Sequence, residues 1–285
     1  MRIRTVGVLG AGTMGAGIAQ VCAQADCDVR LYDVSKEAVA KGVKRISDFL
    51  GKGVGKGKVT AADRDAALAR IRSVTAVSEG ASGADLVIEA APEDLELKRK
   101  LFREVAQVAP KGAILATNTS SLPITRIAED NDAAPRIVGM HFFNPVPLMK
   151  LLELVVGEKT APATVEAVRE FGVRLGKEVI TVRDRPGFAS SRLGIAIAME
   201  AIRMVEEGVA SPEDIDKAMV HGYGHPMGPL RLTDVVGCDI RLAIADHLAE
   251  ALKAQHFKPP QLLRKMVAEG KLGKKSGRGF YEWKE

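Results

Sequence analysis

A glycine-rich turn near the start of the chain constrains its fold more than any other segment. The residues Gly10-Ala11-Gly12-Thr13-Met14-Gly15 follow the β-branched run Val6–Leu9 and open a segment with helical spacing that ends at about Gln24. In such a turn the first glycine permits a tight bend, the second lets a ligand approach the backbone, and the third lets the helix pack closely on the strand. The helix N-terminus then favours an anion. Strand, turn and helix in this order predict a βαβ unit that binds the pyrophosphate of a dinucleotide.

Asp33 supports this interpretation and indicates which dinucleotide binds. It ends a second predicted strand, Val29–Asp33, and lies 18 residues after Gly15. A carboxylate there accepts hydrogen bonds from both ribose hydroxyls and repels a 2′-phosphate, so NAD is favoured over NADP. An ordinary solvated acid at a strand end is the less favoured alternative. Arg30 and Lys36 lie close enough in the sequence to leave some use of NADP open.

Two regions of different character follow from the distribution of apolar residues. Up to about residue 184, short apolar runs alternate with longer amphipathic segments, which is typical of a mostly parallel sheet covered by helices. Beyond it, residues 188–208 have helical spacing and Ser211-Pro212-Glu213-Asp214 is a strong helix start. We therefore expect an α/β fold in which residues 1–184 form a Rossmann-type NAD-binding domain and residues 185–285 form an all-α domain. Further strands, the first of them after a long helical region, are predicted at Leu86–Ala90, Ala113–Ala116, Ile137–Met140, Leu151–Val156 and Val179–Arg183, and further helices near residues 238–254 and 259–269.

His141 is a candidate catalytic base because of its place after the predicted strand Ile137–Met140. It is expected just beyond the carboxyl end of that strand, at the edge where open α/β sheets bind ligands. A neutral imidazole there suits the removal of a hydroxyl proton near pH 7. A lone histidine is, however, more often a hydrogen-bonded structural residue. The other histidines all fall in the expected helical domain: His221, His225, His247 and His256.

Glu153 favours the catalytic interpretation of His141. It lies inside the apolar run Leu151–Val156, where a carboxylate needs a partner that offsets its desolvation. A carboxylate that holds a histidine also keeps one tautomer of the ring. The alternative is that Glu153 faces solvent on an edge strand. Ser120 has a hydroxyl suited to a substrate oxygen, but capping of a helix that begins after Ser121 explains this polar segment equally well.

Composition argues against several other classes of protein. The net charge is +5, but the aromatic content is 4% and no groove-reading motif occurs, so an anionic small molecule is a better partner than nucleic acid. No apolar stretch is long enough for a membrane span, and the strand-like start leaves no room for an export signal. The cysteines lack a metal-ligand spacing and suit a reducing cytoplasm. Neither a metal site nor a Gly-x-Ser-x-Gly nucleophile elbow is predicted.

Further motifs give the chain a resemblance to a known family. Over essentially its whole length it resembles the short-chain L-3-hydroxyacyl-CoA dehydrogenases, most of all those acting on 3-hydroxybutyryl-CoA. The His141 segment, with a glutamate 12 positions on, is the specific part, whereas the glycine turn is not. The segments that carry the resemblance are Gly10–Gly15, Glu89–Glu93, Asn118–Ser121, His141–Pro145, Pro186–Phe188, His225–Leu230 and Gly273–Tyr281.

The resemblance implies a reversible, NAD-dependent oxidation of (S)-3-hydroxyacyl-CoA to 3-ketoacyl-CoA. It implies that His141 is the general base, that Glu153 is its partner and that Ser120 contacts the substrate oxygen. It places Asn144 near the nicotinamide and the reacting carbon, and it implies a homodimer whose helical domains close over the substrate cleft. The NAD contacts that it implies are Glu93, Lys98, Ser120, Asn144 and Lys275, although spacing alone would make Lys98 and Lys275 solvated charges.

Two segments depart from the family pattern. Ser191 stands where the family usually has an asparagine that donates toward the thioester, so it is expected to work through a water or to accompany a different acyl group. The stretch Gly51–Lys58 alternates glycine with lysine and predicts a flexible basic loop in place of a more helical hairpin. Lys52 and Lys56 are candidate ligands of CoA phosphates, and solvated charges in a mobile loop are the equal alternative.

Other functions are compatible with part of this pattern. A related two-domain dehydrogenase of a free hydroxy acid or sugar acid would need a basic residue for the free carboxylate. A nucleotide-binding homologue without turnover is a second alternative, since a fold does not guarantee an activity. Ser120, His141, Asn144 and Glu153 together argue against it, and Ser191 argues weakly for it. A nucleic-acid-binding regulator has no supporting motif.

Overall fold

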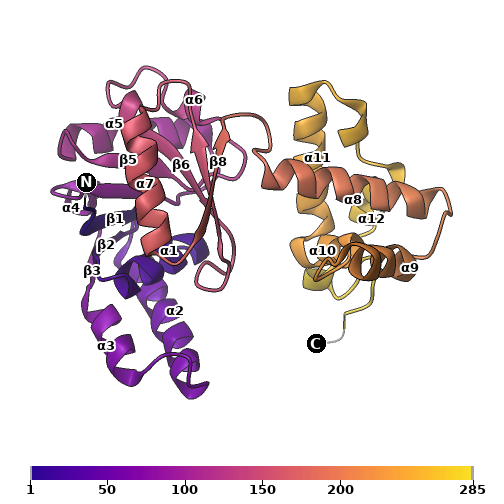
Figure 1. Cartoon of the computed structure of the whole chain (residues 1–285), viewed down its shortest axis with the longest axis horizontal. Coiled ribbons are helices and arrows are strands. Elements are labelled where there is room, and N and C mark those ends of the chain that lie inside the picture. The colour runs from indigo at the N-terminus through magenta and orange to yellow at the C-terminus, as the bar shows by residue number, and fades with distance from the viewer. Residues whose placement is uncertain (1, 284–285) are drawn as a thin grey trace. The chain divides into compact units, whose positions relative to one another are not determined.

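A mostly parallel sheet organises the first of the two units into which the chain divides (Figure 1). This computed structural model describes residues 2–283, and its units comprise residues 1–185 and 186–285. The strands are β1 (Thr5–Leu9), β2 (Asp28–Tyr32), β3 (Ile71–Val74), β4 (Leu86–Glu89), β5 (Ile114–Thr117), β6 (Ile137–Phe142), β7 (Leu151–Val156) and β8 (Glu178–Arg183). Their order in the sheet is β3-β2-β1-β4-β5-β6-β7-β8, and only the β6–β7 pair is antiparallel. The arrangement from β3 to β6 is that of a Rossmann fold, and the predicted fold class is confirmed.

Helices cover both faces of this sheet. They are α1 (Thr13–Gln24), α2 (Lys36–Gly55), α3 (Ala61–Ala69), α4 (Val77–Ala81), α5 (Leu95–Val108), α6 (Ile124–Ile127) and α7 (Pro162–Arg174). Helices α1, α2 and α7 share one apolar core with the Val6 and Val8 face of β1. On the opposite face α4 approaches so closely that a side chain added at Gly7 would begin 2.3 Å from the Gly80 oxygen. Both faces are therefore buried, which explains the continuous apolar runs of the central strands.

The predicted strands are present with ends shifted by at most two residues, but β3 was missed. It lies within the region that the sequence predicts as helical. As an edge strand it pairs with β2 alone. Arg72 and Ser73 are exposed, and only Val74 of this strand is fully buried. A short edge strand of this kind has no apolar run by which it could be recognised.

The prediction of a flexible loop over Gly51–Lys58 is wrong for most of its length, because α2 continues to Gly55. The fully buried Leu50 holds the last turns of α2 on the core. A side chain added at Gly53 would begin 3.2 Å from Cγ2 of Val59, so glycine permits a close approach of the chain that leads to α3. The tip of this helical hairpin extends away from the sheet in Figure 1.

The second unit consists of helices around its own apolar core. They are α8 (Ser190–Glu206), α9 (Pro212–Lys217), α10 (Pro229–Val236), α11 (Cys238–Leu252) and α12 (Gln261–Ala268). The predicted helix start at Ser211 is confirmed, because its hydroxyl accepts a hydrogen bond of 3.1 Å from the backbone N–H of Asp214. Within residues 2–283, no helix is long and apolar enough to cross a membrane.

A buried carboxylate fixes the C-terminal segment of this unit. Asp234 on α10 is 1% exposed. It accepts hydrogen bonds of 2.9 Å from the backbone N–H groups of Phe280 and Tyr281 and from the indole of Trp283. These bonds offset the desolvation of the carboxylate. The segment after α12, which carries Lys275, is thereby anchored to α10.

Candidate active site

The carboxyl ends of β1, β4, β5 and β6 lie side by side, because these strands are parallel neighbours. The segments near these ends carry the glycine turn, Glu93, Ser120 and His141. They surround a pocket of about 360 Å³ at the edge where Rossmann sheets bind ligands. The pocket is lined by Met14, Ala90, Ala91, Glu93, Lys98, Asn118, Ser120, His141, Phe142, Phe143 and Asn144.

Strand pairing brings His141 and Glu153 together. They are direct partners in the antiparallel β6–β7 ladder, so their side chains lie on the same face of the sheet. Nδ1 of His141 lies 2.9 Å from Oε2 of Glu153. Glu153 is fully buried and His141 is 6% exposed. The carboxylate therefore orients the imidazole and stabilises a positive charge on it.

His141 lies within β6 and not beyond its end, which corrects the sequence prediction. Pairing of β5 with β6 stops at Gly139, whereas pairing with β7 continues to Phe142. The ladder with β7 therefore extends the strand through the histidine. The alternative that Glu153 faces solvent on an edge strand is wrong, because β8 pairs along the other side of β7. The two side chains are thus held by the sheet itself.

The geometry of the glycine turn fits a dinucleotide. Gly10 has a φ of 111°, in the region that favours glycine. A side chain added at Gly15 would begin 1.7 Å from the Gly10 oxygen, so the turn excludes a larger residue there. An added Cβ at Gly12 would meet nothing within 4 Å, and Gly12 is the N-cap residue of α1. The N–H groups at the start of α1 therefore face space that a pyrophosphate fits.

Asp33 is fixed beside this turn. Its Oδ2 accepts a hydrogen bond of 2.8 Å from the backbone N–H of Ala11. Arg30 does not compete for it, since its guanidinium donates to the backbone oxygens of Glu79 in α4 and of Ser82 directly after that helix. A carboxylate at the end of β2, with this arginine engaged elsewhere, fits the ribose of NAD and disfavours a 2′-phosphate.

Glu93 organises the segment that contains Ser120. Its Oε1 accepts hydrogen bonds from the Thr119 hydroxyl at 2.5 Å and from the backbone N–H of Ser120 at 3.0 Å. Burial alone would raise the pKa of this carboxyl, but the hydrogen bond from Thr119 and the nearby Lys98 ammonium hold the pKa below its ordinary value. An ionised Glu93 therefore joins the segments after β4 and β5 at the rim of the pocket.

The alternative explanation for this polar segment, a helix cap, is wrong. The N-cap residue of α6 is Pro123, which makes no side-chain hydrogen bond to the helix. The Ser121 hydroxyl donates to Glu93 instead, at 3.1 Å. The segment is thus bonded to Glu93 at the pocket, and Ser120 lines the same pocket.

Glu89 was not singled out by the sequence analysis, and Lys98 is not a solvated charge. Lys98 is 1% exposed, and its Nζ donates to Oε1 of Glu89 at 2.6 Å. The same Nζ lies 3.4 Å from Oε2 of Glu93. The second oxygen of Glu89 accepts a bond of 2.6 Å from the Thr117 hydroxyl. The sequence offered one sign of this network, a carboxylate within the apolar run Leu86–Ala90.

Asn118 and Asn144 complete the pocket near His141. Asn144 lines it, and its predicted place near the reacting carbon stays a prediction. Asn118 lies in a family motif but had no predicted role. Its Oδ1 accepts a hydrogen bond of 2.9 Å from the backbone N–H of Phe142, so the segment after β5 holds the end of β6 next to the histidine.

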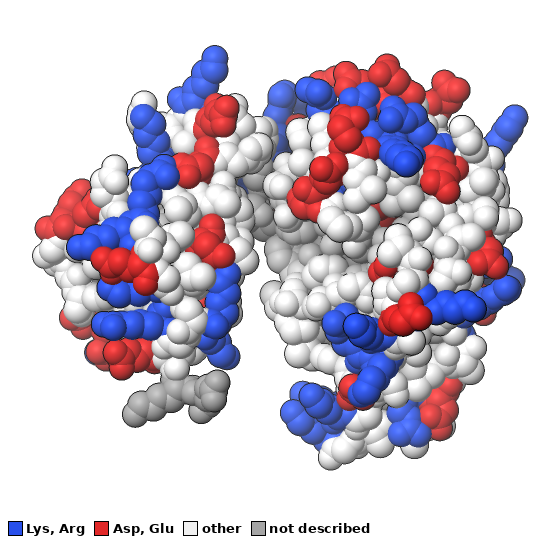
Figure 2. Space-filling view, turned by 180° about the vertical axis from the view of Figure 1, so that it is seen from behind, with Lys and Arg blue, Asp and Glu red and all other residues white. Residues whose placement is uncertain are grey.

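Four predicted ligand residues do not line this pocket. Ser191 is half-buried in the first turn of α8. The Lys275 ammonium lies 2.6 Å from Oδ2 of Asp239, so it is ion-paired. Lys52 and Lys56 are exposed at the end of α2, where Figure 2 shows basic side chains gathered at the tip of the α2–α3 hairpin. Their roles remain predictions.

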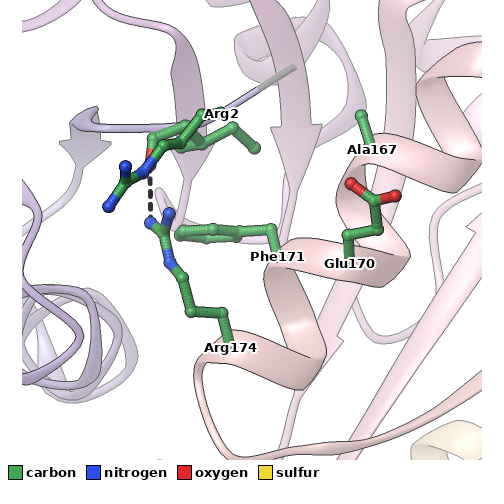
Figure 3. Close-up of a pocket in the computed structure, with 6 residues that line it drawn as sticks. Arg2, Ala167, Glu170, Phe171 and Arg174 are labelled. Atoms are coloured by element: carbon green, nitrogen blue, oxygen red, sulfur yellow. Dashed lines mark hydrogen bonds between the residues drawn. The ribbon is translucent and has the colours of Figure 1, made fainter.

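A second pocket of this unit, of about 390 Å³, is lined by residues from the start of the chain and from α7 (Figure 3). Arg174 in it donates to the backbone oxygen of Ile3 at 2.6 Å and to Sγ of Cys27 at 2.9 Å, and it lies 4.9 Å from the Phe171 ring centroid. This guanidinium ties α7 to the chain before β1, which is a structural role. Among residues 2–283, no group of three or more His, Cys, Asp or Glu side chains is arranged to hold a metal ion.

A histidine held by a carboxylate beside a dinucleotide turn places the protein among the NAD-dependent dehydrogenases. Comparison with known families is more specific. The model for the NAD-binding domain of 3-hydroxyacyl-CoA dehydrogenase matches residues 5–185, and the model for the C-terminal domain of that enzyme matches residues 187–283. The chain belongs to the 3-hydroxyacyl-CoA dehydrogenase family.

Individual relatives agree over the whole chain. A probable 3-hydroxybutyryl-CoA dehydrogenase of Bacillus subtilis is 45% identical over 100% of this chain and 99% of its own length. A 3-hydroxyadipyl-CoA dehydrogenase of Escherichia coli is 43% identical, over 100% of this chain and 60% of its own length. The solved structure of (S)-3-hydroxybutyryl-CoA dehydrogenase from Ralstonia eutropha is 44% identical, covers 100% of both chains and has a TM-score of 0.96.

Proposed function

We propose that the enzyme interconverts (S)-3-hydroxybutyryl-CoA and acetoacetyl-CoA with NAD, and that His141 is its general base. The buried pair of His141 and Glu153, 2.9 Å apart at the ligand-binding edge of the sheet, carries this proposal. Membership of a family described by acyl-CoA substrates disfavours a free hydroxy acid as the substrate. The presence of Ser120 and Asn144 around the same pocket disfavours a homologue without turnover.

Each side chain around the pocket has a separate role in the reaction. NAD⁺, when bound, accepts the hydride from C3 of the substrate. His141 takes the proton of the 3-hydroxyl, and we assign it to Nε2 because Nδ1 faces Glu153. The Glu153 carboxylate stabilises the imidazolium that forms. The Ser120 hydroxyl holds the 3-oxygen by a hydrogen bond, and Asn144 orients the substrate beside the nicotinamide.

The cofactor contacts follow the same edge of the sheet. The turn Gly10–Gly15 binds the pyrophosphate through N–H groups at the start of α1. Asp33 binds the hydroxyls of the adenosine ribose. Glu93 and Lys98 border the nicotinamide end of the pocket. Lys275 of the helical unit is a further NAD contact, and its ammonium then interacts with both NAD and the carboxylate of Asp239.

The remaining assignments concern CoA, assembly and location. Lys52 and Lys56, exposed at the tip of the α2–α3 hairpin, bind CoA phosphates as point charges. The enzyme is a homodimer formed by its helical unit and works in the cytoplasm. Helices α8, α10 and α11 of that unit pack against one another and carry exposed apolar side chains, which supports a dimer. These side chains are Leu193, Ile197, Leu232, Val235 and Ile240.

The decisive assay is oxidation of NADH with acetoacetyl-CoA, compared with free acetoacetate at the same concentration. We expect turnover with the thioester alone, because the CoA contacts contribute binding energy that free acetoacetate lacks. Equal rates with the two substrates would show that CoA is not recognised and would refute the proposal.

Asp33→Asn should reduce the preference for NAD over NADP. The amide oxygen can still accept the N–H of Ala11, which keeps the turn in place, but the charge that repels a 2′-phosphate is lost. We expect kcat/KM with NADH to fall by about 10-fold and that with NADPH to rise, since a hydrogen bond to a charged group contributes about 1.5–3 kcal/mol. Asp28→Asn, at an exposed position on the same strand, is the matched control and should change neither value. An unaltered cofactor ratio in Asp33→Asn would count against the ribose assignment.

A further inference from the structure

A buried lysine lies next to the turn that joins β6 to β7. Lys177 follows the end of α7 and directly precedes β8, and it is only 7% exposed. Burial lowers the pKa of its ammonium, as expected of a desolvated cation. Lysine is almost never buried to this extent unless a partner compensates its charge. The partners of Lys177 therefore indicate what this residue does.

These partners are backbone oxygens of the turn between β6 and β7. Nζ of Lys177 donates to the oxygen of Val146 at 2.5 Å and to the oxygen of Met149 at 2.7 Å. An ammonium group has several N–H donors and can hold both oxygens at once, which an apolar side chain cannot do. Because both bonds go to the backbone and not to a carboxylate, the lysine fixes the path of the turn.

The sequence of the turn explains why it needs these donors. The segment Asn144-Pro145-Val146-Pro147 contains two prolines, and proline has no N–H group to donate. The bond from Lys177 to the oxygen of Val146 is buried, and an unpaired carbonyl in such a place is costly. The ammonium of Lys177 therefore supplies donors that the backbone of this segment lacks.

Both sides of this contact are fixed. Val146 is buried, and a side chain added at Gly17 of α1 would begin 2.8 Å from the Cβ of Val146, so Val146 packs closely on that helix. On the other side, the backbone N–H of Lys177 donates to the oxygen of Gly172 in α7 at 3.1 Å. The ammonium thus joins the turn to two helices that belong to the core of this unit.

The turn held by Lys177 contains Asn144, a residue of the candidate active site. Asn144 lies two residues before Val146, and it lines the pocket that contains His141. We propose that Lys177 is a positioning residue, which keeps Asn144 where it orients the substrate. This inference rests on the proposed function, because that function gives Asn144 its role. Such positioning matters, since a displacement of about 1 Å can cost about 10²-fold in rate.

The first test replaces the lysine and measures reduction of acetoacetyl-CoA by NADH. Lys177→Met keeps the length of the side chain and removes its donors, so we expect kcat to fall by about 10- to 100-fold. The KM for NADH should stay close to the wild-type value, because the glycine turn and Asp33 are separate from this turn. Lys177→Arg, which keeps the charge and the donors, should recover part of the loss. Lys159→Met, at an exposed position after β7, is the matched control and should change neither value.

A double variant distinguishes positioning from a purely structural role. If Lys177 acts through Asn144, adding Lys177→Met to Asn144→Ala should cost little further kcat, because residues that act as a unit are strongly non-additive. Losses that multiply would overturn the inference, and so would a loss of folded protein large enough to explain the lower activity. If Lys177→Met does not fold, Lys177→Gln, which keeps an amide donor, takes its place in the cycle. Failure of both variants to fold would assign Lys177 to the fold alone and overturn the inference.

The outcomes also separate this inference from the proposed function. No turnover of acetoacetyl-CoA by the wild-type enzyme would overturn the proposed function. Wild-type kcat in Lys177→Met, together with a large loss in Asn144→Ala, would overturn the inference alone. Wild-type kcat in Asn144→Ala would overturn both the role assigned to that residue and the inference that Lys177 positions it.

Discussion

Replacing His141 with alanine should lower kcat for acetoacetyl-CoA reduction by about 10²- to 10⁴-fold, the usual contribution of a positioned general acid–base group. In this direction the imidazolium donates its proton to the 3-oxygen as the hydride arrives at C3. Alanine cannot supply this proton, and water in its place is neither held nor oriented by Glu153. The KM for NADH should hardly change, because the glycine turn and Asp33 are separate from the imidazole. Steady-state kinetics with both substrates varied give the two values.

His247→Ala is the matched control for this variant. His247 is an exposed histidine on α11, and its removal should leave kcat unchanged. Binding of NADH to His141→Ala, followed by fluorescence, should match the wild type and would show that the cofactor site is intact. If His141→Ala retains the wild-type kcat, His141 is not the base.

The strands of the sheet differ in how well the sequence predicts them, and the reason is burial. Strands β4, β5 and β6 are buried along their whole length, so each is an apolar run up to the polar residue near its carboxyl end, which is Glu89, Thr117 or His141. At the edge, β3 exposes half of its residues and escapes recognition. The predicted end of β6, Met140, is too early because His141 is polar. Pairing of His141 with Glu153 nevertheless keeps the histidine in the ladder. A polar residue at the end of a strand is therefore difficult to recognise from the sequence when its partner lies on the neighbouring strand.

Charged residues on apolar helix stripes were the other signal that sequence reasoning overlooked. On α5, Lys98 shares the buried face with Phe102 and Val105, at helical spacing. On α11, Arg241 shares the stripe of Cys238, Ala245 and Leu248. The spacing predicts burial of both charges, but it does not show what compensates them. For Lys98 the compensation is Glu89, which comes from a strand nine residues earlier. For Arg241 no ion pair forms within residues 2–283, and its Nε is buried without a hydrogen bond.

Glu153→Gln should lower kcat by about 10²- to 10⁴-fold, although glutamine has nearly the shape of glutamate. The amide can hydrogen-bond the ring but carries no charge to stabilise the imidazolium. Its NH₂ group can also donate to Nδ1 and so favour the tautomer in which Nε2 bears the proton, which cannot accept one from the substrate. KM values should stay close to those of the wild type, because Glu153 is fully buried and does not line the pocket. Glu178→Gln, an exposed carboxylate on the neighbouring strand β8, should have no effect.

A double variant shows whether Glu153 acts through His141. If it does, adding Glu153→Gln to His141→Ala should cost little further activity, because residues that act as a unit are strongly non-additive. The coupling is measured as the ratio of kcat losses around the cycle of two single variants and the double variant. Independent losses that simply multiply would mean that Glu153 serves the site by another route, such as support of the β6–β7 ladder. In that case the Tm of Glu153→Gln should fall in step with its activity, whereas a positioning role predicts a large loss of kcat at nearly unchanged Tm, since a neutral amide is easier to bury than a carboxylate.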